Sequence, residues 1–210
     1  MRGVGIWAIA LVAYGAFLLW YDNWDGPLTA AEIDDYTRRL EARANAPDAE
    51  RRAALRAFLE ADDGSEFFML NLIRTHEGDV VDPGSGELQP APEVLAVYTD
   101  YVMPQIFRRA GHPAFAGPAA GRYLDDWGVE PDPGWSFAGV IRYRSRRDLM
   151  EMATDPGFDA KHAYKIAGMA KTLAFPVAPT AFFVGPRAWL ALTCALLASL
   201  GHLLLGRSRR

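Results

Sequence analysis

Two uninterrupted apolar runs stand at the ends of the chain. Gly3 to Tyr21 contains 19 consecutive residues without a charge, and Ala188 to Gly206 contains another 19. A helix of this length is about 28 Å long, close to the roughly 30 Å hydrocarbon core of a bilayer. We expect transmembrane helices over residues 1–21 and 187–206.

The first run has one competing interpretation, a cleavable signal peptide. A signal peptide has a shorter apolar core, about 7–15 residues, and small residues before the cleavage site. Here the run ends in Trp20 and Tyr21, with Trp24 soon after. Aromatic residues at that position are typical of the membrane interface. The pattern favours an uncleaved anchor.

The charges that flank the two runs predict their orientation. Arg2 precedes the first run, whereas Arg207, Arg209 and Arg210 follow the second. Cytoplasmic flanks of membrane helices are enriched in basic residues. Both termini are therefore expected in the cytoplasm, and residues 22–186 outside it, which means the periplasm in a bacterium.

Residues 22–63 show the pattern of a helical hairpin. Thr29 followed by Glu32 is a capping box, in which each side chain accepts from a backbone amide of the other residue. Apolar positions then recur at helical spacing. Pro47 interrupts this pattern and suits the first turn of a second helix. That second helix is expected to end at Asp62 and the residues after it. The hairpin is expected to lie on the following domain.

From Glu66 onward, short apolar runs alternate with amphipathic segments, in the order strand, helix, strand, strand, helix, strand. We predict a strand at 67–75, a loop at 78–92, a helix at 93–110, strands at 112–124 and 135–143, a helix from 145 to 172 broken at 155–157, and a strand at 173–184.

This order predicts an α+β domain of ferredoxin-like type, βαββαβ, over residues 64–184. Both helices of that fold lie on one face of an antiparallel sheet. The strands nevertheless carry apolar side chains on both faces, for example Phe67 and Phe68. The uncovered face needs a cover, and a second copy of the chain would supply one. We therefore expect a homodimer.

Composition narrows the range of partners. The chain has 22 basic and 26 acidic residues, and the segment 22–186 has 17 and 26, a net charge of −9. Such an acidic domain has little attraction for nucleic acid. Cys194 is the single cysteine of the chain, so it cannot form an internal disulfide, and it lies inside the second apolar run.

Several segments, in their order and spacing, resemble the domain-of-unknown-function 1330 family, a branch of the dimeric α/β-barrel superfamily. The resemblance covers about residues 64–180. It implies a ferredoxin-like fold and a homodimeric barrel, but no activity and no catalytic residues. The two membrane helices and the proline-rich last strand depart from the family's pattern. The segments are 68–74, a helix with Tyr98 and Tyr101, 110–117, Trp135 with 140–146, and 150–158.

Asn71 is the polar exception in an apolar strand. If Phe67, Met69, Asn71 and Ile73 face the space between two sheets, the Asn71 amide points into the dimer barrel. A buried amide needs partners. It either bonds a neighbouring strand, which we prefer, or contacts a ligand.

His162 and Arg142 are the other candidates for chemistry. The superfamily resemblance implies that a helix histidine such as His162 can line a cavity, although a surface position is the favoured interpretation. Arg142 ends a strand and could orient an anion, but pairing with an acid at the sheet rim is favoured. Tyr98 and Trp135 could line an apolar pocket, although such aromatic residues are more often part of the core.

No motif for a cofactor or a metal is present in the sequence. The histidines have no ligand spacing relative to one another, and a metal site usually takes three or more protein ligands. We expect no cofactor and no metal.

Three hypotheses of function follow. The leading one is a two-pass membrane protein whose extracytoplasmic homodimeric domain binds a small, partly apolar molecule. The second is a cofactor-independent oxygenase or isomerase that uses Asn71, Arg142 and His162. The third is a structural module that assembles in the membrane.

Overall fold

The computed structural model describes residues 2–43, 46–180 and 185–207 and divides into two compact units. One unit combines the two ends of the chain. The other is the segment Asp25–Ala178.

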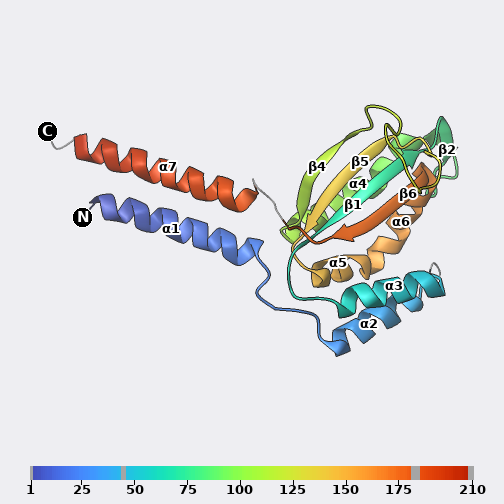
Figure 1. The fold of residues 1–210 in the computed structure, drawn as a ribbon, viewed down its shortest axis with the longest axis horizontal. Helices are drawn as coiled ribbons and strands as arrows, with labels where there is room; N and C mark the ends of the chain where they lie inside the picture. Colours follow the sequence, from blue (N-terminus) through green and yellow to red (C-terminus); the bar gives the residue numbers. More distant parts are fainter. Residues whose placement is uncertain (1, 44–45, 181–184, 208–210) are drawn as a thin grey trace. The chain divides into compact units, whose positions relative to one another are not determined.

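The terminal unit consists of two packed helices, α1 (Arg2–Tyr21) and α7 (Pro186–Arg207) (Figure 1). Both are long and apolar enough to cross a membrane, and only about 6% of each apolar window is buried. Next to the ends of the two windows, the Arg187 guanidinium donates to the Asp22 carboxylate, with Nε 2.7 Å from Oδ1. The predicted apolar helix at each end of the chain is confirmed.

A four-stranded antiparallel sheet forms the centre of the second unit. Its strands are β1 (Phe67–Thr75), β4 (His112–Pro118), β5 (Phe137–Tyr143) and β6 (Met169–Val177). Their order across the sheet is β4-β5-β1-β6, so β4 and β6 are the edges (Figure 1). Together with its helices this sheet confirms the expected α+β class.

Two long helices, α4 (Ala91–Arg108) and α6 (Pro156–Gly168), pack against each other over one face of this sheet (Figure 1). Val102 and Ile106 of α4 are buried, and Tyr143 of β5 packs against them. The apolar side of the amphipathic helix α4 therefore packs against the sheet, as the sequence pattern predicts. Pro104 lies inside α4.

Register assigns the strand residues to two faces. Phe67 pairs with Tyr143, and Asn71 pairs with Gly139, so these four residues share the face that α4 and α6 cover. The opposite face carries apolar side chains that remain substantially exposed. They are Phe115 at 60%, Leu173 at 46% and Phe175 at 43%.

Three further helices form a second layer. Helices α2 (Ala30–Glu41) and α3 (Ala49–Glu60) pack with α5 (Arg146–Ala153) around the fully buried Leu59. The predicted capping box at Thr29 begins α2. Helix α3 starts later than expected, because Asp48 is its N-cap and accepts from the Arg51 amide. Pro47 therefore precedes the helix and does not form its first turn.

The predicted loop at 78–92 contains a small hairpin, β2 (Asp79–Val81) paired with β3 (Leu88–Pro90). Its turn depends on Asp82, whose Oδ1 accepts from the amides of Gly84 and Ser85 at 2.7 Å each. The sequence did not predict this hairpin, because each strand has only three residues and the segment is rich in glycine and proline.

Helix α6 ends at Gly168, four residues before the helix end predicted at residue 172. A Cβ atom on Gly168 would lie 2.8 Å from Leu95 Cβ, so a glycine is what lets α6 end against α4. The chain from Met169 then pairs with β1, beginning at Thr75. Nonlocal pairing therefore overrides the helical pattern at 169–172. The remainder of the predicted last strand, 181–184, lies outside the described residues.

Strand β4 is shorter than the strand predicted at 112–124. Strand β4 ends at Pro118, which pairs with Phe137, the first residue of its partner β5. The Ala119 amide still donates to the Ser136 carbonyl at 3.0 Å, but the strand does not continue beyond Pro118. Leu124 is fully exposed in the segment that follows.

Candidate functional site

A cavity of about 220 Å³ lies between the sheet and the two long helices. It is mainly apolar, because its walls come from the sheet face that α4 and α6 cover. Its lining residues are Asn71, Ile73, Tyr98, Thr99, Val102, Met103, Ile106, Pro113, Ala116, Phe137, Gly139, Ile141, Tyr143, Lys165, Met169 and Thr172. Apolar walls with a few polar groups are typical of sites for small molecules.

Gly139 leaves room in the floor of this cavity. It sits opposite Asn71 in the register of β1 and β5. The absence of a side chain at this position keeps the floor low beside the Asn71 amide. A Cβ atom there would make ordinary contacts only, the nearest at 3.4 Å to Phe137 Cε1.

Asn71 lines the cavity and does not face a second sheet. Asn71 was expected inside a dimer barrel if the alternate residues from Phe67 to Ile73 faced a second sheet. That condition is wrong, because these residues face the helices of their own domain. The Asn71 Nδ2 atom donates to the Met69 carbonyl at 2.9 Å. An amide has two N–H donors and an oxygen acceptor, so one N–H and the Oδ1 atom remain for a molecule in the cavity.

Two tyrosines supply the other polar atoms. Burial raises the pKa of Tyr98 to about 12, and burial also raises the pKa of Tyr143. Both phenols are therefore neutral near pH 7 and can donate a hydrogen bond. No hydrogen bond of either hydroxyl is present within the described ranges.

Lys165 contributes the one charge among the described lining residues. It is half-buried in α6, and its Nζ lies 5.7 Å from the centroid of the Tyr98 ring. Burial lowers the pKa of this ammonium. Lys165 was not among the residues predicted from the sequence, although it shares a helix face with Phe158 and His162 at helical spacing. A lysine on the apolar side of a helix was the available signal.

Arg142 lies away from the cavity. Its side chain is 1% exposed, its Nη2 lies 2.6 Å from Glu66 Oε2, and its Nη1 donates to the Ala110 carbonyl at 2.7 Å. The favoured interpretation, pairing with an acid, agrees with this geometry. The alternative, an arginine that orients a ligand, does not.

His162 is not the surface residue that we predicted. Its ring stacks on Phe158 with centroids 5.5 Å apart and meets Tyr98 edge-on at 6.3 Å. Burial lowers its pKa. The helix face on which His162 lies is covered by α4, which the periodicity of α6 alone does not reveal. His162 does not line the cavity.

Trp135 also lies outside the cavity lining. Its Nε1 donates to the Tyr123 hydroxyl at 2.9 Å, which ties together the two ends of the long segment between β4 and β5. Asn71 and Tyr98 are therefore the only two of the five predicted ligand-binding residues that the described cavity contains.

The three candidate catalytic residues do not meet at one place. Asn71 lines the cavity, Arg142 is held by Glu66, and His162 is packed between aromatic rings. Among the described residues, no group of three or more His, Cys, Asp or Glu side chains could hold a metal ion.

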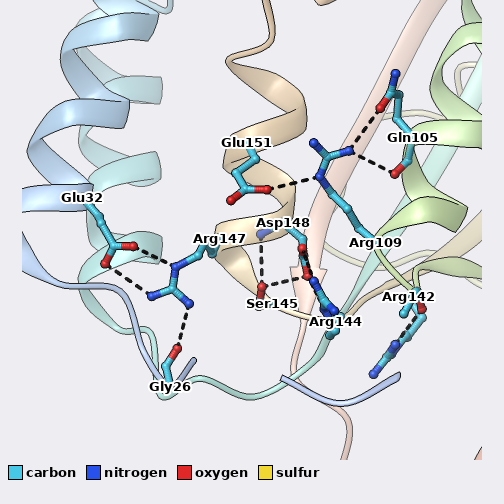
Figure 2. A network of polar contacts seen from close by, with 11 residues as sticks. Gly26, Glu32, Gln105, Arg109, Arg142, Arg144, Ser145, Arg147, Asp148 and Glu151 are labelled. Atoms are coloured by element: carbon cyan, nitrogen blue, oxygen red, sulfur yellow. Dashed lines mark hydrogen bonds and ion pairs between the residues drawn. The ribbon is translucent and has the colours of Figure 1, made fainter. Parts of the chain in front are cut away.

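A network of polar contacts lies between the helices of the domain. Arg147 of α5 donates from Nε to Glu32 of α2 at 2.8 Å and from Nη1 to the Gly26 carbonyl at 3.2 Å (Figure 2). In the same region Arg109 joins α4 to Glu151 of α5. These contacts join the helical layers, and none of these residues lines the cavity.

Comparison with known proteins supports the fold only. No family model matches the chain, and no curated protein matches it. A crystal structure of RPA0582, a protein of unknown function from Rhodopseudomonas palustris, is 21% identical with a TM-score of 0.51, over 65% of this chain and 96% of that one. The methylated RPA0582 protein is 23% identical with a TM-score of 0.51, over 67% and 94%.

Proposed function

We propose that this chain is a membrane-anchored domain that binds a small, partly apolar molecule in the cavity beneath α4 and α6. The observation that carries the proposal is the cavity itself, with apolar walls and the free polar atoms of Asn71 and Tyr98. A structural module has no need of such a space, since native cores are close-packed.

The size of the cavity limits its occupant. An apolar cavity of about 150 Å³ in another protein holds benzene. A volume of about 220 Å³ therefore suits one substituted ring or an aliphatic molecule of similar bulk. Neutral 4-fluorobenzamide is a suitable probe, because it joins an aromatic ring to an amide that Asn71 can bond.

Substitutions of Thr99 can test whether a molecule enters the cavity. It lines the cavity, yet it is exposed on α4, so it marks the mouth. Thr99→Trp should block entry and leave the core intact, whereas Thr99→Val keeps the original size. We expect fluorine NMR of the probe with the full chain in nanodiscs to show binding to the parent and to Thr99→Val, and at least about tenfold weaker binding to Thr99→Trp. Equal binding by all three, or none by the parent, would contradict the proposal.

The family part of the proposal depends on topology. The order β4-β5-β1-β6, with α4 after the first of these strands in the chain and α5 and α6 after the third, is the arrangement expected of a ferredoxin-like domain. It supports the resemblance to the domain-of-unknown-function 1330 family. The exposed Phe115 and Phe175 support a homodimer through the open sheet face. Light scattering of residues 25–178 tests it, because a dimer has twice the monomer mass.

The membrane part of the proposal places both termini in the cytoplasm and the domain on the other side. Two apolar helices of sufficient length support it. The three arginines near the C-terminus support the orientation.

A further inference from the structure

One cation in the domain has a setting unlike that of the arginines around it. Arg142 and Arg147 each lie within 3 Å of a glutamate oxygen. Lys165 has neither a carboxylate nor a hydrogen-bond acceptor as partner among the residues that the structure describes. Its ammonium lies over the face of the Tyr98 ring, and its charge helps to lower the pKa of His162, so neither described interaction supplies a counter-charge.

That arrangement leaves the ammonium under-compensated. The half-buried ammonium loses part of its hydration energy, and a cation–π contact returns only a small part of that loss. Buried charges are normally paired with an opposite charge. Of the described residues that line the cavity, none is an aspartate or a glutamate. The missing counter-charge can therefore come from a molecule bound in the cavity.

We infer that the cavity binds a small apolar carboxylate, whose anionic end pairs with Lys165 and whose hydrocarbon part fills the space under α4. This inference rests on the proposed function and names the class of its ligand. The free N–H of Asn71 and the Tyr98 hydroxyl supply neutral donors in the same cavity. A carboxylate accepts several such bonds at once.

The number of charges favours a monoanion. One described cation faces the cavity, so a phosphate-like dianion would bring more charge than the site neutralises. Most of the remaining walls are aliphatic or aromatic, including Val102, Ile141 and Phe137, and Thr99 and Thr172 add uncharged hydroxyl groups. These walls suit the ring or chain of a carboxylic acid and would not hydrate a second charged group.

Three fluorinated probes of nearly equal shape separate charge from shape. They are 4-fluorobenzoate, 4-fluorobenzamide and 4-fluorobenzylamine, titrated by fluorine NMR into the full chain in nanodiscs of neutral lipid. We expect the benzoate to bind at least about tenfold more tightly than the benzamide, and the benzylamine to bind weakest. Binding of the benzamide alone would keep the proposed function and overturn this inference. Binding of none of the three would overturn both.

Matched variants assign the preference to one side chain. Lys165→Met keeps the apolar stem and removes the charge, and it should reduce the benzoate-to-benzamide preference to about one. Lys165→Arg should restore much of it. Lys161→Met removes the same charge from the same helix but away from the cavity, because Lys161 lies over the Tyr164 ring. An equal loss in Lys161→Met, or a preference that survives in a folded Lys165→Met protein, would overturn the assignment.

Discussion

Individual side chains in this domain have roles that depend on what covers them. His162 and Asn71 illustrate the point, since each differs from its expected role. The half-buried His162 ring packs against Phe158 and Tyr98, whereas Asn71 borders open space and its side chain makes one described hydrogen bond, to Met69 of its own strand. The histidine therefore contributes to packing between α4 and α6, and the asparagine belongs to the site.

Two substitutions separate these roles. His162→Ala removes an aromatic stack, so the free energy of unfolding should fall by about 1 kcal/mol, while binding of 4-fluorobenzamide should persist. Asn71→Ala should change stability by less than that and weaken probe binding several-fold. Chemical unfolding and fluorine NMR measure the two effects, with His76→Ala as an exposed control that should change neither. The opposite pattern would return Asn71 to the core and His162 to the site.

Arginines hold the helical elements together. Arg43, which follows α2, donates to the Ala153 carbonyl at the end of α5 at 2.5 Å and to the Asp155 carbonyl just beyond it at 3.2 Å. The last carbonyls of a helix lack partners within the helix. These contacts help to hold the helical hairpin on the domain.

The Glu32–Arg147 pair makes a pH-dependent contribution at the same interface. The hydrogen bond from Arg147, with the Thr29 amide, lowers the pKa of Glu32 from 4.5 to about 2. A carboxylate whose pKa is depressed by folding stabilises the protein above its unfolded value, and the effect disappears as pH falls through the folded value.

Glu32→Gln should therefore lower stability by about 0.5–1 kcal/mol at pH 7, because the pair is partly exposed. The difference from the parent protein should shrink as the pH falls from about 4.5 toward 2. Urea unfolding across this range measures it, with Glu50→Gln, on the exposed first turn of α3, as a control. A constant difference at all pH values would show that the charge of Glu32 is not responsible.

At the scale of the whole molecule, the terminal helices α1 and α7 are long and apolar enough to cross a membrane, and the proposed function uses them as anchors. The Arg187–Asp22 ion pair joins the segment just after α1 to the start of α7. This pairing neutralises the two charges at that end of the helices. In the proposed topology, the basic residues after α7 are then the main signal for orientation.

We expect a cysteine introduced at Leu124 to react with a membrane-impermeant maleimide in intact cells, because Leu124 is fully exposed. A cysteine appended after Arg210 should react only after permeabilisation. Both variants carry Cys194→Ala, so that the native thiol makes no contribution. If only the appended cysteine were labelled in intact cells, the predicted topology would be wrong.

Local patterns in the sequence were enough for the elements whose cause is local. The two apolar runs, the Thr29 capping box and the strand at 67–75 agree with the structure. Each depends on residues within a few positions of one another, so hydropathy and capping chemistry determine it. The alternation in β1 likewise separated its residues correctly into two faces.

Tertiary structure alone decided which of those faces the helices cover. The same alternation is compatible with Asn71 in a space between sheets or under α4, because periodicity carries no information about the partner. The early start of β6 at Met169 follows from pairing with β1, and the cavity follows from how α4 and α6 pack over Gly139. The isolation of Lys165 from acidic residues has the same origin, since that isolation is a property of side chains brought together from elements distant in the sequence.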